Sequence, residues 1–85
     1  MQVLYFSAPW CSPCKTFKPV VESASSDLGV RVNYVNVDYD ASLPQKYSIT
    51  SVPTIIILGA TGDELYRKSG VMSKDELFRV LNQFR

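Results

Sequence analysis

The chain has 85 residues, nine basic against eight acidic side chains, a net charge of +1 and no histidine. At this length a second domain could not bury a core of its own, so residues 1–85 are expected to form a single domain. The balanced charge argues against nucleic acid as a partner, and no apolar run reaches the roughly 20 residues of a membrane span.

The first predicted elements are a strand and a helix. Residues 2–7, QVLYFS, have the apolar composition of a buried central strand. A helix is expected to open near Cys11, with Pro19 inside it and Gly29 as its C-cap. Apolar side chains recur along this helix at spacings of three and four, whereas Ser25 lies off that stripe. The stripe consists of Cys14, Phe17, Val21, Ala24 and Leu28.

The rest of the chain supplies three strands and two helices. Residues 30–40, VRVNYVNVDYD, predict a second strand and so a right-handed βαβ unit. Residues 41–49 suggest a short helix, and 51–58, SVPTIIIL, a third strand buried on both faces. The turn GATGDE and residues 65–70 complete a hairpin, and Ser73 opens a last helix with an S-x-x-E capping box. The predicted fold class is therefore α/β, in the order β-α-β-α-β-β-α, with helices on both faces of a mixed four-stranded sheet.

Both cysteines lie in PWCSPCK, residues 9–15, as a Cys-x-x-Cys pair that three kinds of site would explain. A structural zinc site needs about four nitrogen or sulfur ligands, and this chain offers two thiols and no imidazole. A structural disulfide across so short a loop would contribute only about 2 kcal/mol through chain entropy. A redox pair has the strongest physical support, because a thiol at the start of a helix meets free N–H groups that favour the thiolate. Cys11 would then attack, and Cys14, one turn later and facing inward, would resolve the mixed disulfide.

The N-terminal segment gives an expectation for the cellular compartment. The segment MQVLYFSAP lacks the basic region and the long apolar stretch of a secretory signal. We therefore expect a cytoplasmic protein, in a compartment that keeps most thiols reduced. There a Cys-x-x-Cys pair is more often catalytic or metal-binding than a permanent cross-link.

The cysteine motif and two later segments together resemble the thioredoxin family. WCSPCK, SVPT and KSGVMSK occur in the family's order and with fitting separations over nearly the whole chain. The resemblance implies a thioredoxin-like fold and a thiol–disulfide oxidoreductase with a redox-active Cys11–Cys14 disulfide and no bound cofactor. It also implies disulfide-containing protein substrates and recharging by a flavoprotein thioredoxin reductase that draws on NADPH. We expect the protein to be a monomer.

The resemblance assigns further residues to a substrate groove beside the disulfide. Trp10 matches the family's aromatic residue next to the nucleophile, and Pro53 matches its cis-proline. The backbone of Val52 would pair with an extended segment of substrate. Gly70 and Val71 match the loop that borders the groove.

The chain departs from the family pattern at three points. It opens at what would be the family's second strand, so one sheet face is expected to be more exposed. Ser12 and Pro13 stand between the cysteines where thioredoxins have Gly-Pro. These residues tune the redox poise, and a hydrogen bond from Ser12 to the Cys11 sulfur would make the pair more oxidising. Tyr5 and Tyr34 replace an Asp and a Lys that exchange the proton of the resolving thiol. A phenol with a pKa near 10 is a poor base at neutral pH, so the tyrosines either only pack or relay a proton by hydrogen bonding.

Two other functions stay open. A glutaredoxin-like reductase recharged by glutathione would share the short core, although Trp10 and the Val-Pro-Thr segment favour a thioredoxin. A thioredoxin-fold binding module without redox chemistry would tolerate both tyrosines. The source of the reducing equivalents distinguishes a glutaredoxin-like reductase from a thioredoxin. Full biological activity in a chain without its two thiols would favour the binding module.

Overall fold

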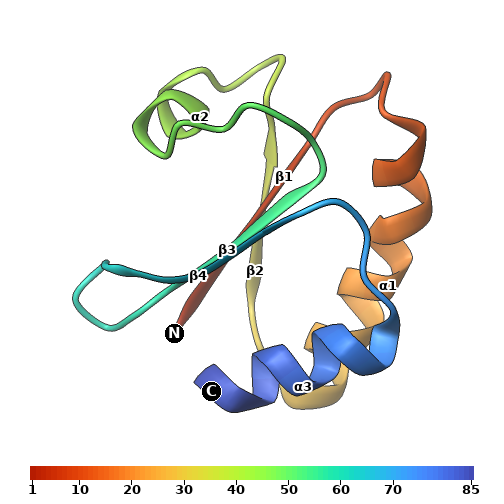
Figure 1. Cartoon of the computed structure of the whole chain (residues 1–85), viewed down its shortest axis with the longest axis vertical. Coiled ribbons are helices and arrows are strands. Elements are labelled where there is room, and N and C mark those ends of the chain that lie inside the picture. Colours follow the sequence, from red (N-terminus) through yellow and green to blue (C-terminus); the bar gives the residue numbers. More distant parts are fainter.

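The computed structural model describes residues 1–85 and contains one mixed sheet with helices on both of its faces (Figure 1). The order of elements is the one predicted from the sequence, although the second strand is shorter than expected because a turn begins at Val37. The elements are β1 (Gln2–Ser7), α1 (Ser12–Leu28), β2 (Val32–Asn36), α2 (Ser42–Lys46), β3 (Thr54–Leu58), β4 (Glu64–Ser69) and α3 (Lys74–Phe84).

The strands lie side by side in the order β2-β1-β3-β4. β1 runs parallel to β2 and antiparallel to β3, and β3 and β4 form the predicted antiparallel hairpin. β1 and β3 are central, and every side chain of β3 is buried, as its run of isoleucines predicts. β2 and β4 are the edges of the sheet.

One face of the sheet packs against α1 and α3, whose ribbons lie together in Figure 1. The predicted apolar stripe of α1 faces this core, and Leu77 and Leu81 of α3 are buried in it. Ser25, predicted to lie off the stripe, is also buried. Its side chain is small, and its hydroxyl is satisfied within the helix because it donates to the Glu22 carbonyl at 3.1 Å.

The other face is covered by α2 and the loop after it, and the extra exposure predicted for this face is not found. Its five core side chains are at most 4% exposed: Leu4, Phe6, Val35, Ile56 and Leu58. The Tyr47 ring lies 6.4 Å from the Phe6 ring, and Leu43 and Ile49 also pack on this cluster. Arg67 of β4 donates to the Tyr47 carbonyl at 2.6 Å, which holds the segment after α2 against the sheet.

The helix termini follow the predicted capping pattern. Gly29 ends α1 with a φ of 66°, a left-handed conformation that glycine adopts without strain. Ser73 accepts a hydrogen bond from the Glu76 N–H at 3.2 Å, which satisfies a free donor at the start of α3. No helix in the structure combines the length and the apolar character needed to cross a bilayer.

Candidate active site around the Cys11–Cys14 disulfide

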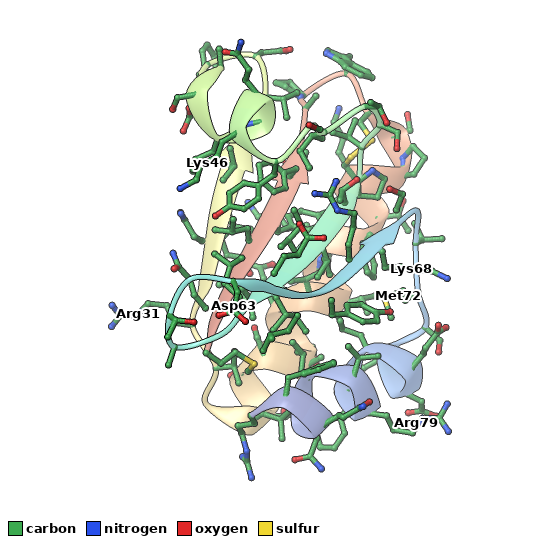
Figure 2. The ribbon with its side chains drawn as sticks, turned by 60° about the vertical axis from the view of Figure 1, so that its left-hand side comes forward. Arg31, Lys46, Asp63, Lys68, Met72 and Arg79 are labelled. Atoms are coloured by element: carbon green, nitrogen blue, oxygen red, sulfur yellow. A yellow bond between two sulfur atoms is a disulfide. The ribbon has the colours of Figure 1, made fainter.

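The two cysteines form a disulfide where the loop after β1 enters α1 (Figure 2). Their Cα atoms are 5.2 Å apart, and both residues are buried, at 4% and 3% exposure. The Cys11 N–H donates to the Ala8 carbonyl at 3.1 Å, which turns the chain from strand to helix. Val37 and Val52 pack against this small cluster, so the disulfide has an apolar wall on the side of the sheet.

The Cys11 sulfur occupies the capping position of α1. Cys11 has an extended backbone, and its Sγ accepts the Cys14 N–H at 3.2 Å, as the oxygen of a serine cap would. The first turn of α1 holds no acidic side chain of its own that would neutralise the positive end of the helix. Pro13 also lies in this turn, where its missing N–H costs nothing because the helix would leave that donor free.

Ser12 does not make the hydrogen bond predicted for it in this disulfide state. It is exposed at the first helical position, and the bond to the Cys11 sulfur comes from the Cys14 backbone instead. The backbone N–H is held in place by the helix, whereas the Ser12 hydroxyl faces water. The local electrostatics of the sulfur are therefore set by the main chain.

Trp10 forms the exposed rim of the site. Its side chain is 68% exposed, yet its ring is oriented because Nε1–H donates to Asp38 Oδ1 at 3.3 Å. Asp38 lies in the turn after β2 and is itself held by a bond from its N–H to Asn36 Oδ1 at 2.9 Å. The sequence reasoning missed Asp38. The parallel pairing of β1 and β2 was the available signal, because the carboxyl ends of parallel strands meet at one edge of a sheet.

The Val52–Pro53 segment and the loop after β4 lie together at the same end of the sheet. The Val52–Pro53 peptide bond is cis, as the resemblance implied. The Gly70 N–H donates to the Pro53 carbonyl at 2.9 Å, and the φ of 90° at Gly70 is one that favours glycine. Val71 follows with 56% exposure. A cavity of about 140 Å³ lies beside Val52, lined also by Val37, Pro44, Ile49, Thr50 and Ser51.

Tyr5 lies beneath the disulfide with no exposed surface. Its hydroxyl donates to the Cys14 carbonyl at 2.9 Å, and its ring meets the Phe17 ring edge-on at 5.9 Å. Burial, and then the charge that Tyr34 would carry if ionised, raise the pKa of Tyr5 to about 12. The phenol is therefore protonated at neutral pH and acts as a hydrogen-bond donor to the backbone of the resolving residue.

Tyr34 lies opposite Tyr5 in the β1–β2 register and reaches the edge of the sheet. The two rings are 5.8 Å apart, and Tyr34 remains 40% exposed. Lys18 Nζ sits 5.3 Å from the Tyr34 ring centre. Burial, followed by the Glu22 carboxylate, raises the pKa of Tyr34 above its ordinary value. Tyr34 thus contacts the layer beneath the disulfide through the Tyr5 ring.

The site holds no metal-ligand set. The structure contains no group of three or more His, Cys, Asp or Glu side chains placed to bind an ion. The reactive element is the disulfide itself, which exchanges two electrons by opening to two thiols.

The whole chain is similar to known thioredoxins. The family model described as Thioredoxin matches residues 1–83. A thioredoxin from Chlamydia caviae is 38% identical over 79 residues, which cover 92% of this chain and 76% of the relative. One from Rickettsia bellii is 37% identical over 79 residues, with 91% and 74% covered. Among solved structures, Fasciola hepatica thioredoxin matches with a TM-score of 0.89 and 30% identity, over 99% of this chain and 80% of the other.

Proposed function

The chain belongs to the thioredoxin family and is a thiol–disulfide oxidoreductase, and from that premise we propose that it reduces protein disulfides with Cys11 as the attacking thiol and Cys14 as the resolving thiol. One observation carries the assignment. The Cys11 sulfur is the one that caps α1 and accepts the Cys14 N–H at 3.2 Å. The two cysteines are almost equally buried, so this position, rather than access, distinguishes them.

The reaction balances as a two-electron exchange between disulfides. The Cys11 thiolate attacks one sulfur of the substrate disulfide, that S–S bond breaks, and the departing substrate sulfur takes up a proton. Cys14 then loses its proton and attacks Cys11 Sγ, which breaks the mixed disulfide and releases the second substrate thiol. The substrate gains two electrons and two protons, and the protein is left with the Cys11–Cys14 disulfide.

The proton of Cys14 leaves without a side-chain base. The nearest titratable group beneath it is Tyr5, whose raised pKa of about 12 keeps the phenol protonated. Its hydroxyl is also committed to the Cys14 carbonyl. We assign Tyr5 and Tyr34 a packing and positioning role, so the proton of Cys14 passes to solvent.

Substrate binds across the rim of the site. Trp10 and Val71 offer exposed apolar surface, and the chain at Val52 offers backbone groups for an extended segment of substrate. Gly70 shapes the border of this groove through its bond to the Pro53 carbonyl. Ser12 and Pro13 adjust the redox poise of the helix turn between the two thiols.

The proposed partners follow from family membership. A flavoprotein thioredoxin reductase returns the disulfide to its dithiol form, and the substrates are proteins that carry disulfides. The cytoplasm suits this direction of exchange, because its glutathione and thioredoxin systems keep thiols reduced. The 85 residues act as one domain.

The decisive test is dithiothreitol-driven reduction of insulin disulfides. The unaltered chain should accelerate precipitation of the insulin B chain, and Cys11→Ser should fall to the rate of dithiothreitol alone. Ser12→Ala, a change at the exposed neighbouring position, should retain most of the activity. No acceleration by the unaltered chain would contradict the proposal.

A second arm identifies the electron source. The oxidised chain is mixed with NADPH and thioredoxin reductase, or with glutathione, NADPH and glutathione reductase. Consumption of NADPH in the first mixture alone supports the proposed partner. Consumption in the second alone would replace it with glutathione.

A further inference from the structure

Residues 47–53 lead from α2 to β3 and include the Val52 backbone that is assigned to substrate. Part of this segment borders the cavity of about 140 Å³, whose lining includes Ile49, Thr50, Ser51 and Val52. Side chains that face a cavity lack the close packing that fixes a protein interior. Hydrogen bonds from neighbouring elements therefore contribute more to the position of this backbone than they would in a packed segment.

Arg67 of β4 holds the beginning of the segment. Its Nε and Nη2 atoms donate to the two carboxylate oxygens of Glu64, each at 2.9 Å. Nη2 also donates to the Tyr47 carbonyl at 2.6 Å. A guanidinium that is bound by a carboxylate through two hydrogen bonds has a fixed plane, so its further donor has a fixed direction. The Tyr47 carbonyl is thereby fixed relative to β4.

The next residue, Ser48, has a strained backbone. Its φ of 53° lies in the left-handed region, which costs energy for any residue other than glycine. Such a conformation persists only where the structure on both sides holds it. Arg67 holds the preceding carbonyl, and the Ile49 N–H donates to the Pro44 carbonyl at 2.8 Å on the other side. Loss of the Arg67 bond removes one of these two constraints, and the residues after Ser48 are then expected to shift.

Ser69 supports the same segment closer to Val52. It lies two positions after Arg67, so both side chains are on one face of β4. Ser69 is opposite Thr54 in the β3–β4 register, and their hydroxyl oxygens are 3.2 Å apart. Thr54 donates its one hydroxyl proton to the Ser51 carbonyl at 2.7 Å, so Ser69 is the donor to Thr54. One face of β4 therefore contacts the segment directly at its beginning and, through Thr54, beside Val52.

We propose that Arg67 is a positioning residue for substrate binding: with support from Ser69, it fixes the backbone of residues 47–53 and so the Val52 groups that pair with a protein substrate. This inference rests on the proposed function, which assigns Val52 to substrate. The cluster around the disulfide includes Val52 but neither Arg67 nor Ser69. Loss of Arg67 should therefore weaken the binding of an extended substrate and leave thiol exchange itself intact.

Single-turnover oxidation of the reduced chain by excess insulin measures both quantities without a reductase. Rapid alkylation and mass spectrometry follow the loss of free thiols as the insulin concentration is varied. Arg67→Met should raise the insulin concentration for half-maximal rate about fivefold to tenfold and change the maximal rate less than about twofold. Ser69→Ala should raise it about twofold. Lys68→Met is the control, because it removes the same charge from a side chain that points away from the sheet (Figure 2).

A small disulfide separates positioning from a general loss of structure. Hydroxyethyl disulfide is too short to pair with the Val52 backbone, so Arg67→Met should reduce it at the rate of the unaltered chain. The amide NMR signals of Ile49 and Val52 should shift in Arg67→Met, whereas those of α3 should not.

Three outcomes would count against these assignments. Equal half-saturation by insulin in Arg67→Met and the unaltered chain would overturn the role of Arg67 alone. An equal loss of rate toward insulin and hydroxyethyl disulfide would also overturn it, because it would indicate a general structural defect. An unaltered chain that reacts with hydroxyethyl disulfide but not with insulin would contradict the proposed function itself, and this inference with it.

Discussion

The rim of the disulfide and the layer beneath it are built from different kinds of side chain. The rim is exposed and polar at its margin, with Trp10 68% exposed and bonded to the Asp38 carboxylate. The layer beneath is closed and aromatic, with Tyr5 fully buried between Phe17 and Tyr34. Under the proposed function, substrate recognition and thiolate stabilisation belong to the rim and the first turn of α1, whereas the lower layer holds the Cys14 carbonyl through the Tyr5 hydroxyl.

The largest expected effect separates the two thiols. Cys11→Ser and Cys14→Ser should each lower turnover of a protein disulfide about 100-fold or more, since each removes a sulfur that exchange requires. Only Cys14→Ser should accumulate a mixed disulfide with the substrate, because the capping sulfur of Cys11 is still present to attack. Non-reducing electrophoresis and mass spectrometry measure the adduct. Equal trapping by both variants would show that the helix turn does not distinguish the thiols.

Alkaline unfolding tests the aromatic layer beneath the disulfide. The pKa of Tyr5 is about 12 in the folded chain, against an ordinary value of 10, so the folded state holds this proton more tightly. The stability due to this difference is complete below pH 10 and is lost as the pH rises through 12, by about 2 kcal/mol at pH 12. In urea melts from pH 8 to 12, Tyr5→Phe should lose stability less steeply than the unaltered chain. At pH 7 the same variant should be about 1 kcal/mol less stable, because the Cys14 carbonyl loses a hydrogen bond.

The matched control for this change is Tyr39→Phe, at a ring that is 87% exposed. It should follow the unaltered chain across the whole pH range. A Tyr5→Phe chain with the same alkaline slope as the unaltered protein would mean that the phenol is not held in its protonated form by burial.

A smaller effect is expected at the rim. Trp10→Phe keeps an aromatic ring and removes the N–H, and Asp38→Ala removes its acceptor. Each should raise KM for a protein substrate about threefold to tenfold, since a hydrogen bond of this kind contributes about 1 kcal/mol. Because both changes break the same bond, their effects in the double variant should be much less than additive. Fully additive effects would show that the two side chains act separately.

Local sequence patterns predicted the elements and the reactive turn. The spacing of apolar residues in α1, the cap at Gly29 and the capping box at Ser73 depend on residues within a few positions of one another. The pairing of Cys11 with Cys14 is local for the same reason. Interactions of this range are readable from a chain because the helix fixes the distance between their members.

The features that sequence reasoning missed are long-range contacts of single polar atoms. Trp10 and Asp38 are 28 positions apart, and Arg67 and the Tyr47 carbonyl are 20 apart. The contact between Arg67 and Tyr47 holds the loop that covers the second sheet face. A prediction from helix content alone therefore overestimated the exposure of that face. Backbone acceptors such as the Cys14 carbonyl carry no sequence signature, which is why the partner of Tyr5 could not be foreseen.

The Ser12 hydroxyl should have a modest effect on the reduction potential of the Cys11–Cys14 pair. Ser12 makes no bond to sulfur in the disulfide state, so its contribution is confined to the reduced form, where it competes with water. If it donates to the Cys11 thiolate, the reduced state gains stability and the pair is more oxidising than in Ser12→Gly. We expect a difference of about 10 mV, equivalent to roughly a twofold change in the equilibrium constant. Equilibration with glutathione measures it, and a potential equal to or below that of Ser12→Gly would contradict this role.

The smallest expected effect is that of removing the Tyr5 hydroxyl on turnover at neutral pH. Tyr5→Phe should change the rate of insulin reduction less than about twofold, because the phenol is protonated and bonded to a carbonyl rather than to a thiol. A group that moved a catalytic proton would contribute about 100-fold or more. The pH profile gives an independent reading: its shape between pH 6 and 9 should be the same in both chains, since no group of the lower layer titrates there. A large loss of rate with an altered profile would place proton transfer in the aromatic layer and remove the functional distinction between it and the rim.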